Sequence, residues 1–171
     1  MRLRRVLAGV GAVVAVVGLA VTPAFASAPT PWQTFREEPF TDAAGTVCSF
    51  GLHGDIVDDH ELVRTLQTYP DGSPLEQEFV GPLIIKFTNM DSGASVIRNL
   101  TGTGFFFFDP DGSIHGNGFG HIGIGVHIGK TTTTPSGEWI LSGTFDFVLG
   151  SDGVRTFDVT GTQENLCETL A

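Results

Sequence analysis

The alternation of apolar and polar residues is clearest in EWILSGTFDFVL, residues 138–149. Its odd positions carry the apolar side chains Trp139, Leu141, Phe145, Phe147 and Leu149. Its even positions carry Glu138, Ser142, Thr144 and Asp146 among others. Successive side chains of a strand point to opposite faces, so this alternation predicts an antiparallel strand with one buried and one solvent-facing side.

Turn sequences rich in Pro, Asp and Gly divide the rest of the chain into further strands. These turns fall at residues 69–72, 91–93, 109–112, 135–137 and 151–153. Strands are predicted at residues 46–53, 61–69, 75–80, 83–89, 96–108, 114–129, 138–149 and 154–161. Residues 163–171 are expected to form a short turn or helix around Cys167.

The prediction is an all-β protein of about seven or eight strands joined mostly by short turns. Sequential connections and many glycines inside long strands favour an antiparallel up-and-down β-barrel, because glycine permits sharp curvature. A β-sandwich is the alternative.

The composition along the chain divides it into three predicted segments: a signal peptide, an irregular arm and a β domain. Residues 1–26 have the arginines, the apolar run and the Ala24-Phe25-Ala26 triplet of a cleaved signal peptide, which predicts a secreted, extracellular protein. Residues 27–45 are expected to be an irregular arm, because Pro29, Pro31 and Pro39 interrupt regular structure. Residues 46–171 are expected to form a single β domain.

The charge balance restricts the partners of the protein. Three of its nine basic residues and none of its 19 acidic residues lie in residues 1–26. Removal of that segment would therefore change the net charge from −10 to −13. Such a charge opposes binding to nucleic acid and to anionic membranes, and no stable membrane span is expected after signal removal.

Cys48 and Cys167 are the two cysteines of the chain. An even pair in an exported protein predicts a disulfide. The bridge would close a loop of about 120 residues, for which chain entropy gives a stabilisation on the order of 4–5 kcal/mol. Two cysteines without neighbouring ligands do not suggest a structural zinc site.

Four consecutive phenylalanines, Phe105, Phe106, Phe107 and Phe108, form the most unusual apolar stretch. On a strand they point alternately to two faces, so one pair can fill the core while the other needs a different cover. That cover is the N-terminal arm, a partner protein, or a ligand in an apolar pocket. The pocket hypothesis names these phenylalanines with Trp139, Phe145 and Phe147 as its lining.

Residues 114–129 alternate between an aliphatic or glycine face and a face that contains His115, His121 and His127. Six residues of strand span roughly 20 Å, so these histidines cannot share one metal ion on a straight strand. We therefore predict no metal site, and the role of the three histidines stays open. We also predict no bound cofactor.

Catalytic motifs are not evident. The chain has neither a Gly-x-Ser-x-Gly elbow nor a cysteine beside a histidine. Asp55, Asp58, Asp59, His60 and Glu61 form its densest run of titratable residues, which is typical of a solvated loop but could serve acid–base chemistry.

Short motifs along the chain resemble a group of small secreted bacterial proteins of unknown function. They are residues 38–41, 87–93, 100–102, 143–147 and 166–171. The Gly102-Thr103-Gly104-x-Phe106 segment is also similar to a strand of dirigent and allene-oxide-cyclase barrels, which implies a barrel shape. The group supplies no catalytic residues.

Three hypotheses for function follow. The first is a non-enzymatic β-barrel that binds a small apolar ligand or a surface partner. The second is a cyclase- or isomerase-like barrel enzyme, which requires a titratable group inside a cavity. The third is a structural protein of the cell envelope with an exposed aromatic patch.

Overall fold

The computed structural model describes residues 28–130 and 133–171. In them the regular structure is antiparallel β-structure except for one short helix, as predicted. The elements are β1 (Gln33–Thr34), β2 (Phe40–Asp42), β3 (Leu52–Asp59), β4 (Leu62–Thr68), β5 (Pro74–Gly81), β6 (Leu83–Asn89), β7 (Ser95–Asn99), β8 (Gly102–Phe108), β9 (Ile114–Val126), β10 (Gly137–Leu149), β11 (Arg155–Asn165) and the short helix α1 (Leu166–Thr169).

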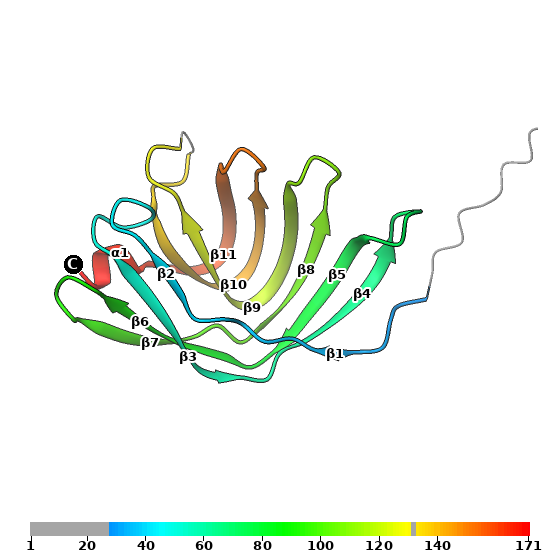
Figure 1. The fold of residues 1–171 in the computed structure, drawn as a ribbon, viewed down its shortest axis with the longest axis horizontal. Helices are drawn as coiled ribbons and strands as arrows, with labels where there is room; N and C mark the ends of the chain where they lie inside the picture. The colour runs from blue at the N-terminus through cyan, green and yellow to red at the C-terminus, as the bar shows by residue number, and fades with distance from the viewer. Residues whose placement is uncertain (1–27, 131–132) are drawn as a thin grey trace, which may run out of the picture.

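The strands form two sheets (Figure 1). The larger has seven strands in the order β1-β4-β5-β8-β9-β10-β11, and the smaller has four in the order β2-β3-β6-β7. Neither sheet closes on itself among the described residues, so the predicted closed up-and-down barrel is not observed there. The all-β class is confirmed.

The strand predicted over residues 96–108 is divided into two strands in different sheets. β7 pairs with β6 in the smaller sheet, and β8 pairs with β5 and β9 in the larger one. Between them the backbone N–H of Leu100 donates to the Leu83 carbonyl at 2.8 Å, and Leu100 is buried. The apolar pattern continues through this crossing, so the pattern alone does not reveal that the chain changes sheet.

A row of five glycines crosses the larger sheet, one on each of its five central and C-terminal strands. The register places Gly81 opposite Gly102, Gly102 opposite Gly120, Gly120 opposite Gly143, and Gly143 opposite Gly161. A Cβ on Gly102 would stand 2.5 Å from the His121 carbonyl oxygen, and one on Gly120 would stand 2.8 Å from the Gly102 Cα. Only glycine permits so close an approach of neighbouring backbones.

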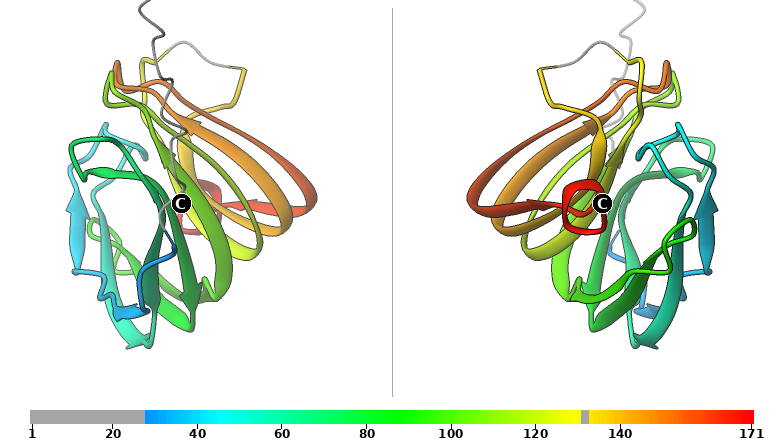
Figure 2. Two further views of the ribbon diagram at one scale, coloured as in Figure 1. Left: turned by 90° about the vertical axis from the view of Figure 1, so that its right-hand side faces the viewer. Right: turned by 90° about the vertical axis from the view of Figure 1, so that its left-hand side faces the viewer.

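The larger sheet bends strongly around this glycine row. Figure 1 shows β9, β10 and β11 curving, so that the β10–β11 turn and the β9–β10 connection lie on the same side of the molecule. Lys130 Nζ donates to the Asp152 carbonyl at 2.6 Å and links the two. Figure 2 shows the consequence end-on: β2 and β3 lie on one side, and β10 and β11 lie on the other.

Two buried clusters hold the sheets together. The first joins the smaller sheet, α1 and Ile140, with Leu52, Phe87 and Leu166 fully buried. The second lies inside the bend of the larger sheet and contains Ile124, Val126, Trp139, Leu141, Phe145 and Phe147. The first half of β10 is therefore covered on both faces, and the prediction of a solvent-facing Glu138 is wrong: this side chain is buried.

The N-terminal arm contributes two short strands that the proline spacing did not predict. β1 pairs with β4, and β2 pairs with β3. The Phe35 ring packs edge-on against Phe79 at a centroid distance of 5.1 Å, so the arm is anchored by its aromatic side chains.

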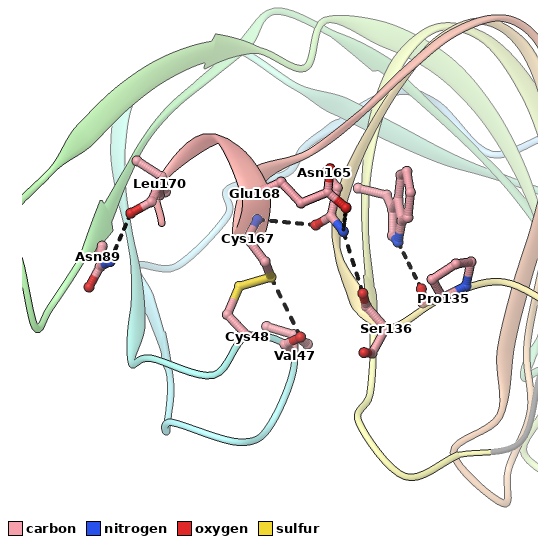
Figure 3. Close-up of a disulfide and its surroundings, with 10 residues drawn as sticks. Val47, Cys48, Asn89, Pro135, Ser136, Asn165, Cys167, Glu168 and Leu170 are labelled. Atoms are coloured by element: carbon pink, nitrogen blue, oxygen red, sulfur yellow. Dashed lines mark hydrogen bonds between the residues drawn. A yellow bond between two sulfur atoms is a disulfide. The ribbon is translucent and has the colours of Figure 1, made fainter.

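The predicted Cys48–Cys167 disulfide is present (Figure 3). It joins the segment before β3 to α1, with the two Cα atoms 5.2 Å apart. The Asn165 side chain caps the helix by accepting from the Cys167 N–H, and Asn89 Nδ2 donates to the Leu170 carbonyl at 2.8 Å. The C-terminal segment is thus fastened to both sheets.

The predicted signal segment, residues 1–26, lies outside the described residues. Within residues 28–130 and 133–171, no helix has the length and apolar character needed to cross a membrane.

Candidate functional site

A cavity of about 430 Å³ lies between the two sheets. Its walls are mainly aromatic and aliphatic, and both sheets and the N-terminal arm contribute to them. The aromatic lining consists of eight phenylalanines: Phe35, Phe40, Phe79, Phe87, Phe106, Phe108, Phe145 and Phe147. Its volume falls in the range of about 300–1,000 Å³ that is typical of small-molecule sites.

Four of the seven aromatic residues predicted to line a pocket lie on this cavity: Phe106, Phe108, Phe145 and Phe147. Phe106 packs between Phe79 and Phe147, with centroid distances of 4.9 and 5.0 Å. These rings form a continuous aromatic wall across β5, β8 and β10.

The other three predicted lining residues lie elsewhere. Phe105 and Phe107 have the opposite parity on β8 and are not part of the cavity wall, and Phe107 stacks on His115 at 5.1 Å. Trp139 is buried in the second cluster, where it contacts Phe157 and donates through Nε1 to the Pro135 carbonyl at 3.0 Å. The bend of β10 places Trp139 away from the cavity although Phe145 and Phe147 line it.

The most notable polar group on the cavity wall is Glu138, which is 7% exposed. Its carboxyl group lies over Gly123 and Gly125 of β9. A Cβ on Gly123 would stand 3.2 Å from Oε1, and a Cβ on Gly125 would stand 2.9 Å from Oε2, so the missing side chains leave room for the carboxyl group. Among the described residues no hydrogen bond to either carboxyl oxygen is present. Burial, aided by the charge of Asp42, raises the pKa of Glu138 to about 8.

The positive charge of Arg155 acts on Glu138 and opposes the rise of that pKa. Arg155 Nη1 donates to the Gly125 carbonyl at 2.8 Å. The same nitrogen lies 3.5 Å from the place that a Cβ on Gly125 would occupy. No ion pair between Arg155 and Glu138 forms in the described structure. The guanidinium and the carboxyl group therefore flank the bare Gly125 backbone without contacting each other.

A second set of carboxyl groups lies where the arm meets β3 and β4. Glu37 and Glu61 line the cavity, and Asp59 accepts from the backbone N–H of both. Glu61 Oε2 is buried without a hydrogen-bond partner. Burial, followed by the charges of Asp59 and Glu37, raises the pKa of Glu61 to about 7, and Arg36 lowers it only in part.

The three histidines of β9 and its C-terminal end have separate environments. His115 is exposed on the outer face, where its Nδ1 lies 2.9 Å from Asp109 Oδ2. His121 lines the cavity. Burial and the nearby Arg155 lower the pKa of His127. Among the described residues no group of three or more His, Cys, Asp or Glu side chains could hold one metal ion.

Sequence reasoning missed Glu138 and Arg155 and placed Glu61 in a solvated loop. Glu138 obeys the polar–apolar alternation of β10, and nothing local reveals that Val47 and α1 cover the face that it shares with Ile140. The available signal was the pair Gly123 and Gly125, since glycines opposite a polar residue leave space for its side chain.

Comparison with known proteins adds no assignment: no family model matches the chain, and no curated protein or solved structure is significantly similar to it.

Proposed function

We propose that the protein is a non-enzymatic, secreted binding protein that holds a small apolar ligand in the cavity between its two sheets. The observation that carries the proposal is the 430 Å³ cavity with its eight phenylalanines. Burying a ligand there would remove apolar surface from water at about 25 cal/mol per Å² before the costs of binding are counted.

The architecture supports this proposal. The row from Gly81 to Gly161 curls the larger sheet around the cavity, which favours a barrel-like container over two flat sheets. The disulfide and the absence of a membrane-spanning helix among the described residues are compatible with secretion.

The test is a fluorescence titration with N-phenylnaphthylamine, an uncharged apolar probe whose emission rises in an apolar site. The variant Gly123→Leu fills the cavity from its wall. A Cβ there meets Glu138 Oε1 at 3.2 Å and Leu100 Cδ1 at 3.4 Å, so the substitution requires only a small shift of side-chain ends and no change of the backbone. We expect micromolar binding by the wild-type protein and at least tenfold weaker binding by Gly123→Leu.

Thr144→Leu is the matched control, because it adds a similar apolar side chain to the exposed face of β10. It should bind the probe as the wild-type protein does. Equal probe affinity in all three proteins would exclude the cavity as the binding site.

A cyclase- or isomerase-like enzyme is the second candidate, and the buried carboxyl groups of Glu138 and Glu61 favour it. Their pKa values of about 8 and 7 lie near the range that suits general acid–base catalysis at neutral pH. Compounds that co-purify with the protein would then exchange hydrogen with D2O in its presence. Glu138→Gln should abolish that exchange while retaining the compounds, and no exchange by the wild-type protein would exclude this candidate.

A further inference from the structure

Besides Glu37, Glu61 and His121, the mainly apolar cavity wall carries the polar side chains of Glu138 and Arg155, which lie close to each other. Both groups border the same cavity, and both lie against the bare backbone of Gly125. Among the described residues the Glu138 carboxyl has no hydrogen bond, and the Arg155 guanidinium has one, from Nη1 to the Gly125 carbonyl. A guanidinium carries five N–H donors, so Arg155 has donors left for another acceptor.

Because no hydrogen bond from the described residues reaches the Glu138 carboxyl group, its partner has to come from the cavity, and leaving it unpaired there would cost about 1–3 kcal/mol. Such a group is retained at low cost only when something else satisfies it. A ligand that reaches the gap between Glu138 and Arg155 would do so.

The charges at the gap select the kind of ligand group. Burial raises the pKa of Glu138 to about 8, so at neutral pH this carboxyl group is mostly uncharged and a cationic group meets the opposed charges of Arg155 and Asp42, with no net attraction. An anionic group would be repelled by Glu138 when it is ionised, and by Asp42, whose charge acts on the same position. A neutral hydroxyl both accepts and donates, so it can accept from the Arg155 guanidinium and pair with Glu138 in either protonation state.

We propose that the ligand is an uncharged apolar alcohol whose hydroxyl group occupies the gap between Glu138 and Arg155 while its hydrocarbon body lies against the phenylalanine wall. This inference rests on the proposed function and adds the chemical class of the ligand.

The experiment compares three probes with one hydrocarbon body: decanol, decylammonium and decanoate. Each is used to displace N-phenylnaphthylamine from the purified protein at neutral pH. We expect decanol to displace it at a concentration at least tenfold lower than either ion. Tighter binding of decylammonium or decanoate, or equal binding of all three, would overturn the alcohol assignment while probe binding itself still supports the cavity.

Two substitutions at one position separate a polar role from a structural one. Glu138→Gln keeps a donor and an acceptor and should change decanol affinity by less than threefold. Glu138→Leu has neither, and should raise the decanol concentration needed to displace N-phenylnaphthylamine about tenfold relative to Glu138→Gln, or about 1.4 kcal/mol. Undiminished decanol binding by Glu138→Leu would contradict the proposal, whereas failure of the wild-type protein to bind any probe would contradict the proposed function as well.

Discussion

Gly120 on β9 and Gly143 on β10 lie directly opposite each other, with φ angles of +96° and +131°. A Cβ on Gly143 would collide with the Thr160 carbonyl oxygen of the next strand. Residues other than glycine rarely adopt such φ values, so this pair requires glycine for both backbone conformation and space. The bend that surrounds the cavity depends on it.

The first prediction concerns this bend. Gly143→Ala should lower the free energy of unfolding by about 2–4 kcal/mol, through backbone strain and the clash with Thr160. Urea denaturation followed by circular dichroism measures the change. Thr144→Ala, one residue away on the exposed face, should stay within about 0.5 kcal/mol of the wild-type value. Equal stability of the two variants would show that the glycine pair does not determine the bend.

The second prediction concerns the disulfide. Replacing both Cys48 and Cys167 with alanine should lower the free energy of unfolding by about 2–5 kcal/mol, because the unfolded chain loses a loop constraint spanning 119 positions. A reducing agent should destabilise the wild-type protein by a similar amount and leave the double variant unchanged. Sensitivity of the double variant to the reducing agent would contradict this explanation.

The third prediction separates the two faces of β8. Phe106→Ala removes a ring packed between Phe79 and Phe147 and should cost about 3–4 kcal/mol of stability and weaken probe binding. Phe107→Ala removes a ring that stacks on His115 outside the cavity, and should cost about 1 kcal/mol without affecting the probe. Equal effects of the two substitutions on probe binding would contradict the assignment of Phe106 to the cavity wall and Phe107 to the opposite face of β8.

The fourth prediction is a pH dependence that originates at Glu138. Burial raises its pKa from 4.5 to about 8, so the folded state binds more protons than the unfolded state between these values. Stability therefore falls as pH rises from about 5 to 8, with an upper bound on the order of 5 kcal/mol from this group. Glu138→Gln should remove most of this slope and should be more stable than the wild-type protein at pH 8.

Asp158→Asn is the control for that experiment, because it removes an exposed carboxylate on β11 outside the cavity. Its pH profile should run parallel to that of the wild-type protein. A residual slope in Glu138→Gln is expected from Glu61, whose pKa is also raised. If the free energy of unfolding changed with pH equally in the wild-type protein and in Glu138→Gln, the buried Glu138 carboxyl group could not be the source of the pH dependence.

The sequence predicted most of the local structure. Apolar alternation located β6 and β10, turn residues located the hairpins after β4, β8 and β10, and the cysteine count predicted the disulfide. These features depend on neighbouring residues or on a single pairing, so a linear pattern contains them.

The cavity and its polar groups could not be predicted in the same way. The five glycines of the bend are unevenly spaced along the chain and align only once the strand register is known. Glu138 has the position of a solvent-facing residue in β10, and its burial depends on Val47 and α1 from distant parts of the sequence.

The central claim, that a ligand binds between the two sheets, is tested most directly by NMR of labelled methyl groups during a titration with decanol. Binding between the sheets should give saturable shifts for Ile85, Leu100 and Ile122, which line the cavity. Methyl signals of the exposed Val57, Ile97 and Val148 should stay in place. Shifts confined to those three exposed residues, or no saturable shift of the three cavity residues, would show that decanol does not bind between the sheets.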